Sequence, residues 1–100
     1  MQVAVYGTLK HGCHNSRLLT KSKLKSVERI EGYEMLNNRG MYPIAIKKEG
    51  VSMHVEVYQI DDRQLVSLDR LEGYPTHYDR ELIETSVGPA WLYYQIAVSY

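Results

Sequence analysis

The chain has 100 residues, which is enough for one domain with a single hydrophobic core. Hydrophobic residues make up 44% of it and charged residues 24%, a composition that is typical of a globular protein and excludes a disordered chain. Twelve basic and twelve acidic side chains balance, so the whole chain has no net charge that would attract nucleic acid or an anionic membrane. We therefore treat residues 1–100 as one domain.

The N-terminal half has the pattern of a sheet protein. Residues 2–6, QVAVY, are apolar and rich in β-branched side chains, which predicts a strand, and GTLKHG after them predicts a glycine-bounded loop. Residues 14–20 predict a short helical turn. Two strands are expected at 24–30 and 32–38, separated by Gly32.

The middle of the chain continues this pattern. The sequence NNRGMYP predicts a turn at 37–43, followed by a strand at 44–48 and a second turn at Glu49–Gly50. Apolar side chains then alternate with polar ones through residues 51–60, which predicts a half-buried strand.

One segment has clear helix signals. Asp61 is a good N-cap and Gln64 completes a capping box, while Gly73 ends the helix and Pro75 prevents its continuation. Two final strands, 78–85 and 90–98, follow. The pattern predicts an α+β domain, with a small mixed or antiparallel β-barrel, one main helix and short flanking helical turns.

The predicted helix has a carboxylate on its apolar side. On a helical wheel Leu65, Leu68 and Leu71 form one arc, Glu72 falls inside that arc, and Asp69 falls at its edge. Burial would raise the pKa of Glu72 toward the range of a general base or acid, and the negative end of the helix dipole acts in the same direction. The alternatives are that Glu72 turns outward in a frayed last turn, or that it pairs with Arg80.

The loop after the first strand is a second candidate. Gly7 allows a sharp turn that exposes consecutive backbone N–H groups to a carboxylate or an amide oxygen. The segment is not a phosphate-binding loop, because Cys13 rather than lysine follows Gly12. An ordinary turn is the alternative.

Other side chains give weaker signals. His11, Cys13 and His14 are too crowded for a zinc site and lack a second ligand pair, so we expect no metal. The same cluster could activate Cys13 as a nucleophile, although an unreactive loop cysteine is favoured. His54 is expected at the surface, and His77 is a weak candidate for lining a cleft. Solvent exposure is favoured over nucleic-acid binding for the basic side chains Lys10, Arg17, Lys21, Lys23, Lys25 and Arg29.

The chain carries no signal for secretion or a membrane. The single cysteine cannot form an internal disulfide, which suits a reducing compartment. The N-terminal segment has no basic lead, and no stretch approaches the roughly 20 apolar residues that span a bilayer. We expect a soluble, cytoplasmic protein.

Two motifs together resemble a known family. The segment YGTLKHG resembles the Y-G-[ST]-L-[RK]-x-G signature of the γ-glutamylcyclotransferase-like superfamily, which includes γ-glutamylamine cyclotransferase and AIG2-like members. The segment LDRLEGYPTHYDR resembles the same family's L-D-x-[LF]-E-G-Y-P-x-x-Y-x-R pattern. Further matches at MYPIAI and VEVYQI extend the resemblance over nearly the whole chain.

The resemblance implies a reaction and a site. Members of this family close the α-amine of a γ-glutamyl group onto its own γ-carbonyl, which releases 5-oxoproline and the attached amine or amino acid without a cofactor. Carried over, Glu72 is the general base and acid, and the backbone amides of Tyr6, Gly7, Thr8 and Leu9 hold the substrate, with Tyr78 also assigned to substrate binding. The partner is then a small γ-glutamyl compound. A non-catalytic ligand-binding module of the same fold is the alternative.

Overall fold

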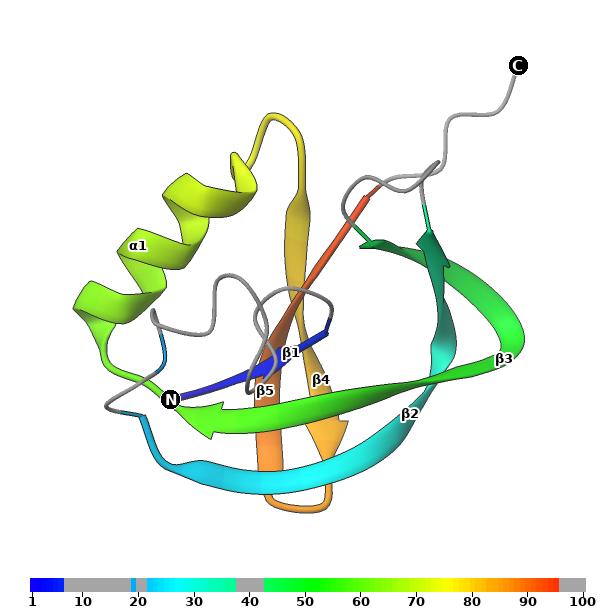
Figure 1. The fold of residues 1–100 in the computed structure, drawn as a ribbon, viewed down its shortest axis with the longest axis horizontal. Coiled ribbons are helices and arrows are strands. Elements are labelled where there is room, and N and C mark those ends of the chain that lie inside the picture. Colours follow the sequence, from blue (N-terminus) through cyan, green and yellow to red (C-terminus); the bar gives the residue numbers. More distant parts are fainter. Residues whose placement is uncertain (7–18, 20–21, 38–42, 96–100) are drawn as a thin grey trace.

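The computed structural model describes residues 1–6, 19, 22–37 and 43–95. Within them the elements are β1 (Gln2–Val5), β2 (Leu24–Asn37), β3 (Pro43–Gln59), α1 (Asp62–Glu72), β4 (Asp79–Thr85) and β5 (Gly88–Tyr94). The strands form one mixed sheet in the order β2-β3-β1-β5-β4. The α+β class is therefore confirmed. Figure 1 shows the long β2–β3 hairpin sweeping around the shorter strands, with α1 beside them.

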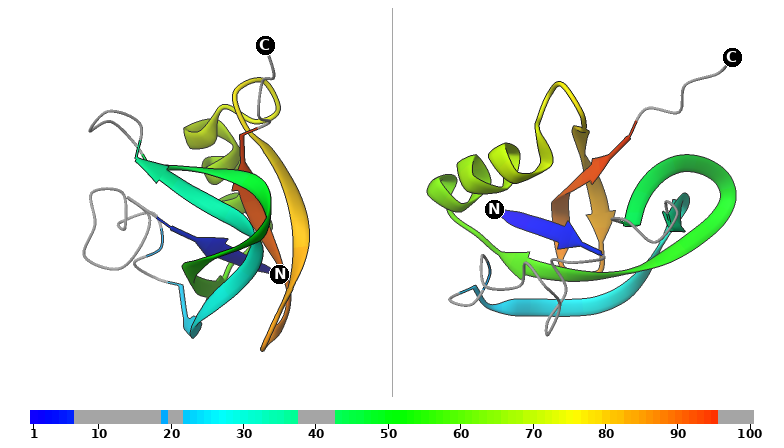
Figure 2. Two further views of the ribbon diagram at one scale, coloured as in Figure 1. Left: turned by 90° about the vertical axis from the view of Figure 1, so that its right-hand side faces the viewer. Right: turned by 45° about the horizontal axis from the view of Figure 1, so that its top comes forward.

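The two long strands differ from the prediction. Gly32 and Gly50 were expected to separate strands, yet β2 and β3 run through them without interruption. Both glycines have positive φ, 87° and 83°, and the β2–β3 register shifts between Glu31 and Tyr33. A glycine in this conformation bends a strand without ending it. The predicted breaks are instead positions inside continuous strands, and both views of Figure 2 show how strongly this hairpin curls.

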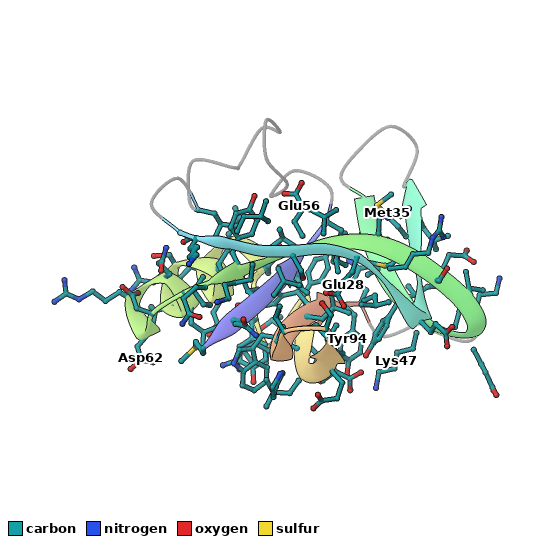
Figure 3. All side chains as sticks on the ribbon, turned by 90° about the horizontal axis from the view of Figure 1, so that it is seen from below. Glu28, Met35, Lys47, Glu56, Asp62 and Tyr94 are labelled. Carbon is teal, nitrogen blue, oxygen red and sulfur yellow. The ribbon has the colours of Figure 1, made fainter. Side chains whose placement is uncertain are left out.

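The expectation of a barrel is wrong in one respect, because the sheet does not close. Its curl brings the first half of β3 to the end of β5, where Ile46 and Gln95 form an isolated parallel bridge and the Gln95 N–H donates to the Ala45 carbonyl at 2.8 Å. Among the described residues no backbone ladder joins the two edge strands, β2 and β4. The Glu28 carboxylate on β2 instead accepts the Ser86 N–H from the β4–β5 turn at 2.9 Å. Figure 3 shows Glu28 projecting toward this hairpin.

The described residues form a core of two clusters. Alternate residues of β1 point to opposite faces of the sheet, so that Val3 and Val5 face α1 while Ala4 faces the inside of the curl. The helix-side cluster contains Val3, Val5, Leu19, Tyr58, Ile60, Leu68 and Tyr93. The inner cluster contains Ala4, Ile30, Tyr33, Ala45, Met53, Val55, Val57, Ala90, Leu92 and Tyr94.

Two further predictions fall on segments that the structure describes only in part. The helical turn expected at 14–20 lies outside the described residues except for Leu19, which is buried. The turn at 37–43 joins two paired strands, since Asn37 lies opposite Pro43, but residues 38–42 lie outside the described part. In the described part of the chain, no helix is long and apolar enough to cross a membrane.

Candidate active site

The predicted caps fix both ends of α1. Asp61 accepts the Gln64 N–H at 2.8 Å and the Gln64 side chain accepts the Asp61 N–H at 2.9 Å, which confirms the capping box. At the other end Gly73 adopts the left-handed conformation, with φ 69°. Its N–H bonds to the Arg70 carbonyl and that of Tyr74 to the Asp69 carbonyl, as in a Schellman motif. Glu72 is therefore the last helical residue, directly before a fixed turn.

We expect Gly73→Ala to destabilise the protein, because a side chain there forces an L-residue into the left-handed region at a cost of about 1–2 kcal/mol. A Cβ at this position would also lie 2.6 Å from Cδ2 of His77, so the imidazole must move. Gly32→Ala is a matched control, because its φ is also positive but no atom lies within 4 Å of an added Cβ. Urea unfolding should give the larger loss for Gly73→Ala, and equal losses would contradict the role of the His77 contact.

The buried face of α1 contains two carboxylates. Leu68 is fully buried, and Leu65, Asp69 and Glu72 are partly buried, which is the i, i+3, i+4, i+7 pattern of one helical stripe. Leu71 was expected in this stripe, but 44% of it is exposed. The stripe is rotated toward Asp69, which has partners on the sheet.

Asp69 is held by two side chains from the sheet. Its carboxylate accepts Arg80 Nε at 2.9 Å and Arg80 Nη2 at 3.4 Å, and the Tyr93 hydroxyl also donates to it. The guanidinium carbon of Arg80 lies 4.4 Å from the ring centroid of Tyr74 and 4.3 Å from that of Trp91. These contacts dock the C-terminal end of α1 onto β4 and β5. The alternative that Arg80 pairs with Glu72 is therefore wrong.

Glu72 differs from Asp69 in having no such partner. Among the described residues its carboxylate forms no hydrogen bond or ion pair. Burial raises the pKa of Glu72 from 4.5 to about 7. A carboxyl group with this pKa exists in both protonation states near neutral pH, as a group that both accepts and returns a proton must.

Among the described residues, three phenols lie close enough to Glu72 for its negative charge to raise their pKa. Burial raises the pKa of Tyr78 to about 12, with a further contribution from the negative charge of Glu72. Burial and the Glu72 charge also raise the pKa of Tyr6, which comes from the end of β1, and Glu72 adds to the increase for Tyr93 on β5. Glu72 therefore faces a half-apolar, tyrosine-rich surface built from β1, β5 and the segment before β4.

Comparison with known proteins identifies the family of the chain. The family model described as gamma-glutamyl cyclotransferase, AIG2-like matches residues 3–98. The chain belongs to this family.

Individual relatives support the assignment. The gamma-glutamylcyclotransferase family protein YtfP of Escherichia coli is 40% identical over 93 residues, which cover 93% of this chain and 80% of the relative. The crystal structure of an uncharacterized protein from Pyrococcus horikoshii matches with a TM-score of 0.84 and 30% identity, covering 95% of this chain and 77% of that one. An AIG2-like protein from Mus musculus, at 21% identity and a TM-score of 0.74, shares the fold over 94% of this chain and 76% of its own.

The residues that match the second cyclotransferase-family motif have separate tasks in this structure. Leu68 fills the helix-side cluster, Asp69 docks the helix through Arg80, and Gly73 ends it. Glu72 forms no hydrogen bond or ion pair with the described residues.

The other candidate residues fall into two groups. Tyr6 and Tyr78 lie near Glu72, while Gly7, Thr8 and Leu9 lie outside the described residues, as do His11, Cys13 and His14. His54 and His77 are exposed. The part of the chain that the structure describes contains no group of three or more side chains that could hold a metal ion.

Sequence reasoning missed Tyr93 and the aromatic contacts of Arg80. A usable signal was present, because Trp91 and Tyr93 are two residues apart on one strand and therefore share a face. That face packs on the helix-side cluster, where it meets Asp69 and Arg80.

Proposed function

We propose that this protein is a γ-glutamyl cyclotransferase that converts a γ-glutamylamine to 5-oxoproline and a free amine, with Glu72 as the only acid–base group. The observation that supports the proposal best is Glu72 itself. It is a carboxyl group on the apolar face of a helix, without a cation among the described residues, and its pKa is about 7. Such a group is costly to a fold that does not use it.

The chemistry needs one group that moves a proton twice. The substrate's α-ammonium gives a proton to Glu72, and the freed amine attacks the γ-carbonyl carbon. A carbon–nitrogen bond forms to the α-nitrogen, and the bond to the leaving nitrogen breaks as Glu72 returns the proton to it. The second proton that the α-nitrogen loses as it becomes the lactam N–H passes to the released amine, which leaves as an ammonium ion. The γ-carbonyl oxygen stays in the ring, and no water, oxidant or reductant is consumed.

Holding the substrate in a reactive conformation would supply much of the rate acceleration. The nucleophile is part of the substrate, so holding the γ-glutamyl chain folded replaces an encounter between two molecules. We assign the binding of the α-carboxylate and of the developing oxyanion to backbone amides of Tyr6, Gly7, Thr8 and Leu9. Tyr78 forms no hydrogen bond within the described residues, so its hydroxyl is free to donate to the substrate.

The surroundings of Glu72 favour an uncharged leaving group. The described side chains that respond to its charge are the phenols Tyr6, Tyr78 and Tyr93. Among the described residues the cation near them is Arg80, which is occupied by Asp69. A leaving amino acid would bring a second carboxylate that these side chains do not neutralise, whereas a simple amine would not. This difference supports a γ-glutamylamine over a γ-glutamyl dipeptide.

A substrate panel tests the proposal. Purified protein is incubated with γ-glutamyl alkylamines, γ-glutamyl dipeptides and glutathione, and 5-oxoproline is measured by mass spectrometry. We expect 5-oxoproline to form faster from the γ-glutamyl alkylamines than from the dipeptides or glutathione. Faster turnover of dipeptides would overturn the substrate class. Saturable binding of the panel compounds without any product would favour a non-catalytic binding module.

We expect the rate to depend on pH through Glu72. The reaction requires its carboxylate form, so kcat/KM should rise with pH and level off above an apparent pKa near 7. A limb near pH 4.5, the ordinary value for a glutamate, would contradict the burial that the structure gives this side chain. The measurement is kcat/KM for one alkylamine substrate across the range from about pH 5 to about pH 9.

A further inference from the structure

Two of the described hydrogen-bond donors around Glu72 are bonded elsewhere. The Tyr6 hydroxyl donates to the Tyr93 carbonyl at 2.7 Å, and the Tyr93 hydroxyl donates to Asp69 Oδ1. Two of the three phenols that feel the Glu72 charge therefore have their protons committed to other acceptors. Neither stabilises the Glu72 anion by a hydrogen bond.

Among the described residues, Arg80 is the cation that could pair with Glu72. Asp69 and Glu72 are three residues apart and lie on one face of α1, so a guanidinium at Asp69 is about one helical turn from Glu72. Arg80 Nε and Nη2 both contact the Asp69 carboxylate, and the rings of Tyr74 and Trp91 lie against the guanidinium. Three side chains, Asp69, Tyr74 and Trp91, therefore fix its position, and none of them is Glu72.

The pKa of Tyr93 responds to the charges of Asp69, Arg80 and Glu72. Burial raises the pKa of its phenol, the bond to Asp69 and the charges of Asp69 and Glu72 raise it further, and the charge of Arg80 lowers it. Asp69, Arg80 and Glu72 thus all act on one hydroxyl group. Because Asp69 and Glu72 are one helical turn apart on α1, a change in the Asp69–Arg80 pair is expected to alter the field at Glu72.

We propose that Asp69 is a positioning residue that holds Arg80 and the Tyr93 hydroxyl away from Glu72, so that the acid–base carboxylate remains without a cation. The inference rests on the proposed function of Glu72 for its biological meaning, but it concerns the field of this chain's own residues. Its consequence is that a free Arg80 would lower the Glu72 pKa and weaken this group as a base near neutral pH.

Other titratable groups around Glu72 are few. Within the described residues they are Asp69 on α1, Tyr6 after β1, Tyr78 before β4, Arg80 on β4 and Tyr93 on β5, with the exposed His77 in the turn after Gly73. Removing the Asp69 charge therefore leaves Arg80 as the dominant new influence on Glu72.

Asp69→Asn tests the proposal without substrate. Asparagine retains an acceptor for Arg80 and Tyr93 but carries no charge, so the cation is no longer neutralised. The pKa of Glu72 is read from its side-chain carboxyl ¹³C shift in a pH titration, with Glu72→Gln to assign the signal. We expect the pKa to fall by about 1 or more in Asp69→Asn, since an unpaired cation about one helical turn away has an effect of that size. Asp69→Asn/Arg80→Gln should return it to within a few tenths of the wild-type value.

The outcomes separate this proposal from the proposed function. An unchanged Glu72 pKa in a folded Asp69→Asn variant would overturn the role of Asp69, whether or not the protein is an enzyme. If Asp69→Asn does not fold, Arg80→Gln decides the question, because an Asp69 anion without its cation must raise the Glu72 pKa, and no change there would equally overturn it. For an active enzyme, the acidic limb of kcat/KM should move in parallel with the titration. A purely structural role would lower activity without moving that limb.

Discussion

Replacing Glu72 by glutamine is expected to lower kcat/KM for 5-oxoproline release by about 10²–10⁴-fold, the usual contribution of a general acid–base group. Glutamine keeps the size of the side chain and its place on α1 but cannot take the proton from the α-ammonium. Glu84→Gln is the matched control, because Glu84 is an exposed glutamate on β4 and should leave the rate unchanged. Equal activity of Glu72→Gln and wild type would contradict the mechanism.

The same variant should show that the charged form of Glu72 lowers the stability of the folded protein. Its pKa is raised in the folded protein, so the stability that it contributes is fully present below about pH 4.5 and is lost as the pH rises through about 7. The difference in unfolding free energy, Glu72→Gln minus wild type, should therefore increase by roughly 2 kcal/mol between about pH 5 and about pH 9. This figure is reduced because Glu72 is partly exposed. A constant difference across this range would show that Glu72 titrates normally.

Removing Asp69 altogether is expected to give the largest loss of stability. Asp69→Ala leaves Arg80 in place with its guanidinium against two rings and no carboxylate, and it leaves the Tyr93 hydroxyl without its acceptor. Breaking a buried ion pair from one side costs about 3–5 kcal/mol, and the lower end applies because the two side chains are 16% and 20% exposed. Thermal or urea unfolding measures the loss.

A second ion pair provides the control. Lys47 and Glu81 are 2.8 Å apart, but their side chains are 54% and 34% exposed. Glu81→Ala should therefore cost less than about 1 kcal/mol. A similar loss for Glu81→Ala and Asp69→Ala would mean that the Asp69–Arg80 pair does not dock the helix.

Local signals predicted α1 well because its ends are decided by neighbouring residues. The Asp61–Gln64 capping box and Gly73 act within a few positions of the chain, so the sequence contains all that they need. The bends at Gly32 and Gly50 were misread because a glycine between two apolar segments can end a strand or bend it. Only the pairing of β2 with β3 on both sides of each glycine decides between these outcomes.

The site was predictable to the extent that one helix face determines it. The wheel placed Glu72 on the buried side, and its raised pKa agrees with that placement. The wheel could not show that Leu71 is exposed, or that Arg80 contacts Asp69, because both depend on where β4 and β5 lie against α1. The same is true of Tyr93, whose partner is 24 residues away in the sequence.

The open sheet also lay beyond sequence reasoning. The strand pattern was that of a small barrel, but closure depends on whether the two edge strands meet. Glu28 instead reaches the β4–β5 turn through its side chain, and β3 meets the end of β5 through the single bridge of Ile46 with Gln95. Neither contact has a local signature.

The most direct test of the central claim is the origin of the oxygen atoms in the product. A γ-glutamylamine is turned over in H₂¹⁸O, and the products of wild type and Glu72→Gln are analysed by mass spectrometry. Intramolecular attack by the α-amine predicts that wild type forms 5-oxoproline without ¹⁸O. Glu72→Gln should form almost no 5-oxoproline. Glutamate carrying ¹⁸O would mean that water is the nucleophile, and it would contradict the cyclisation proposed for Glu72.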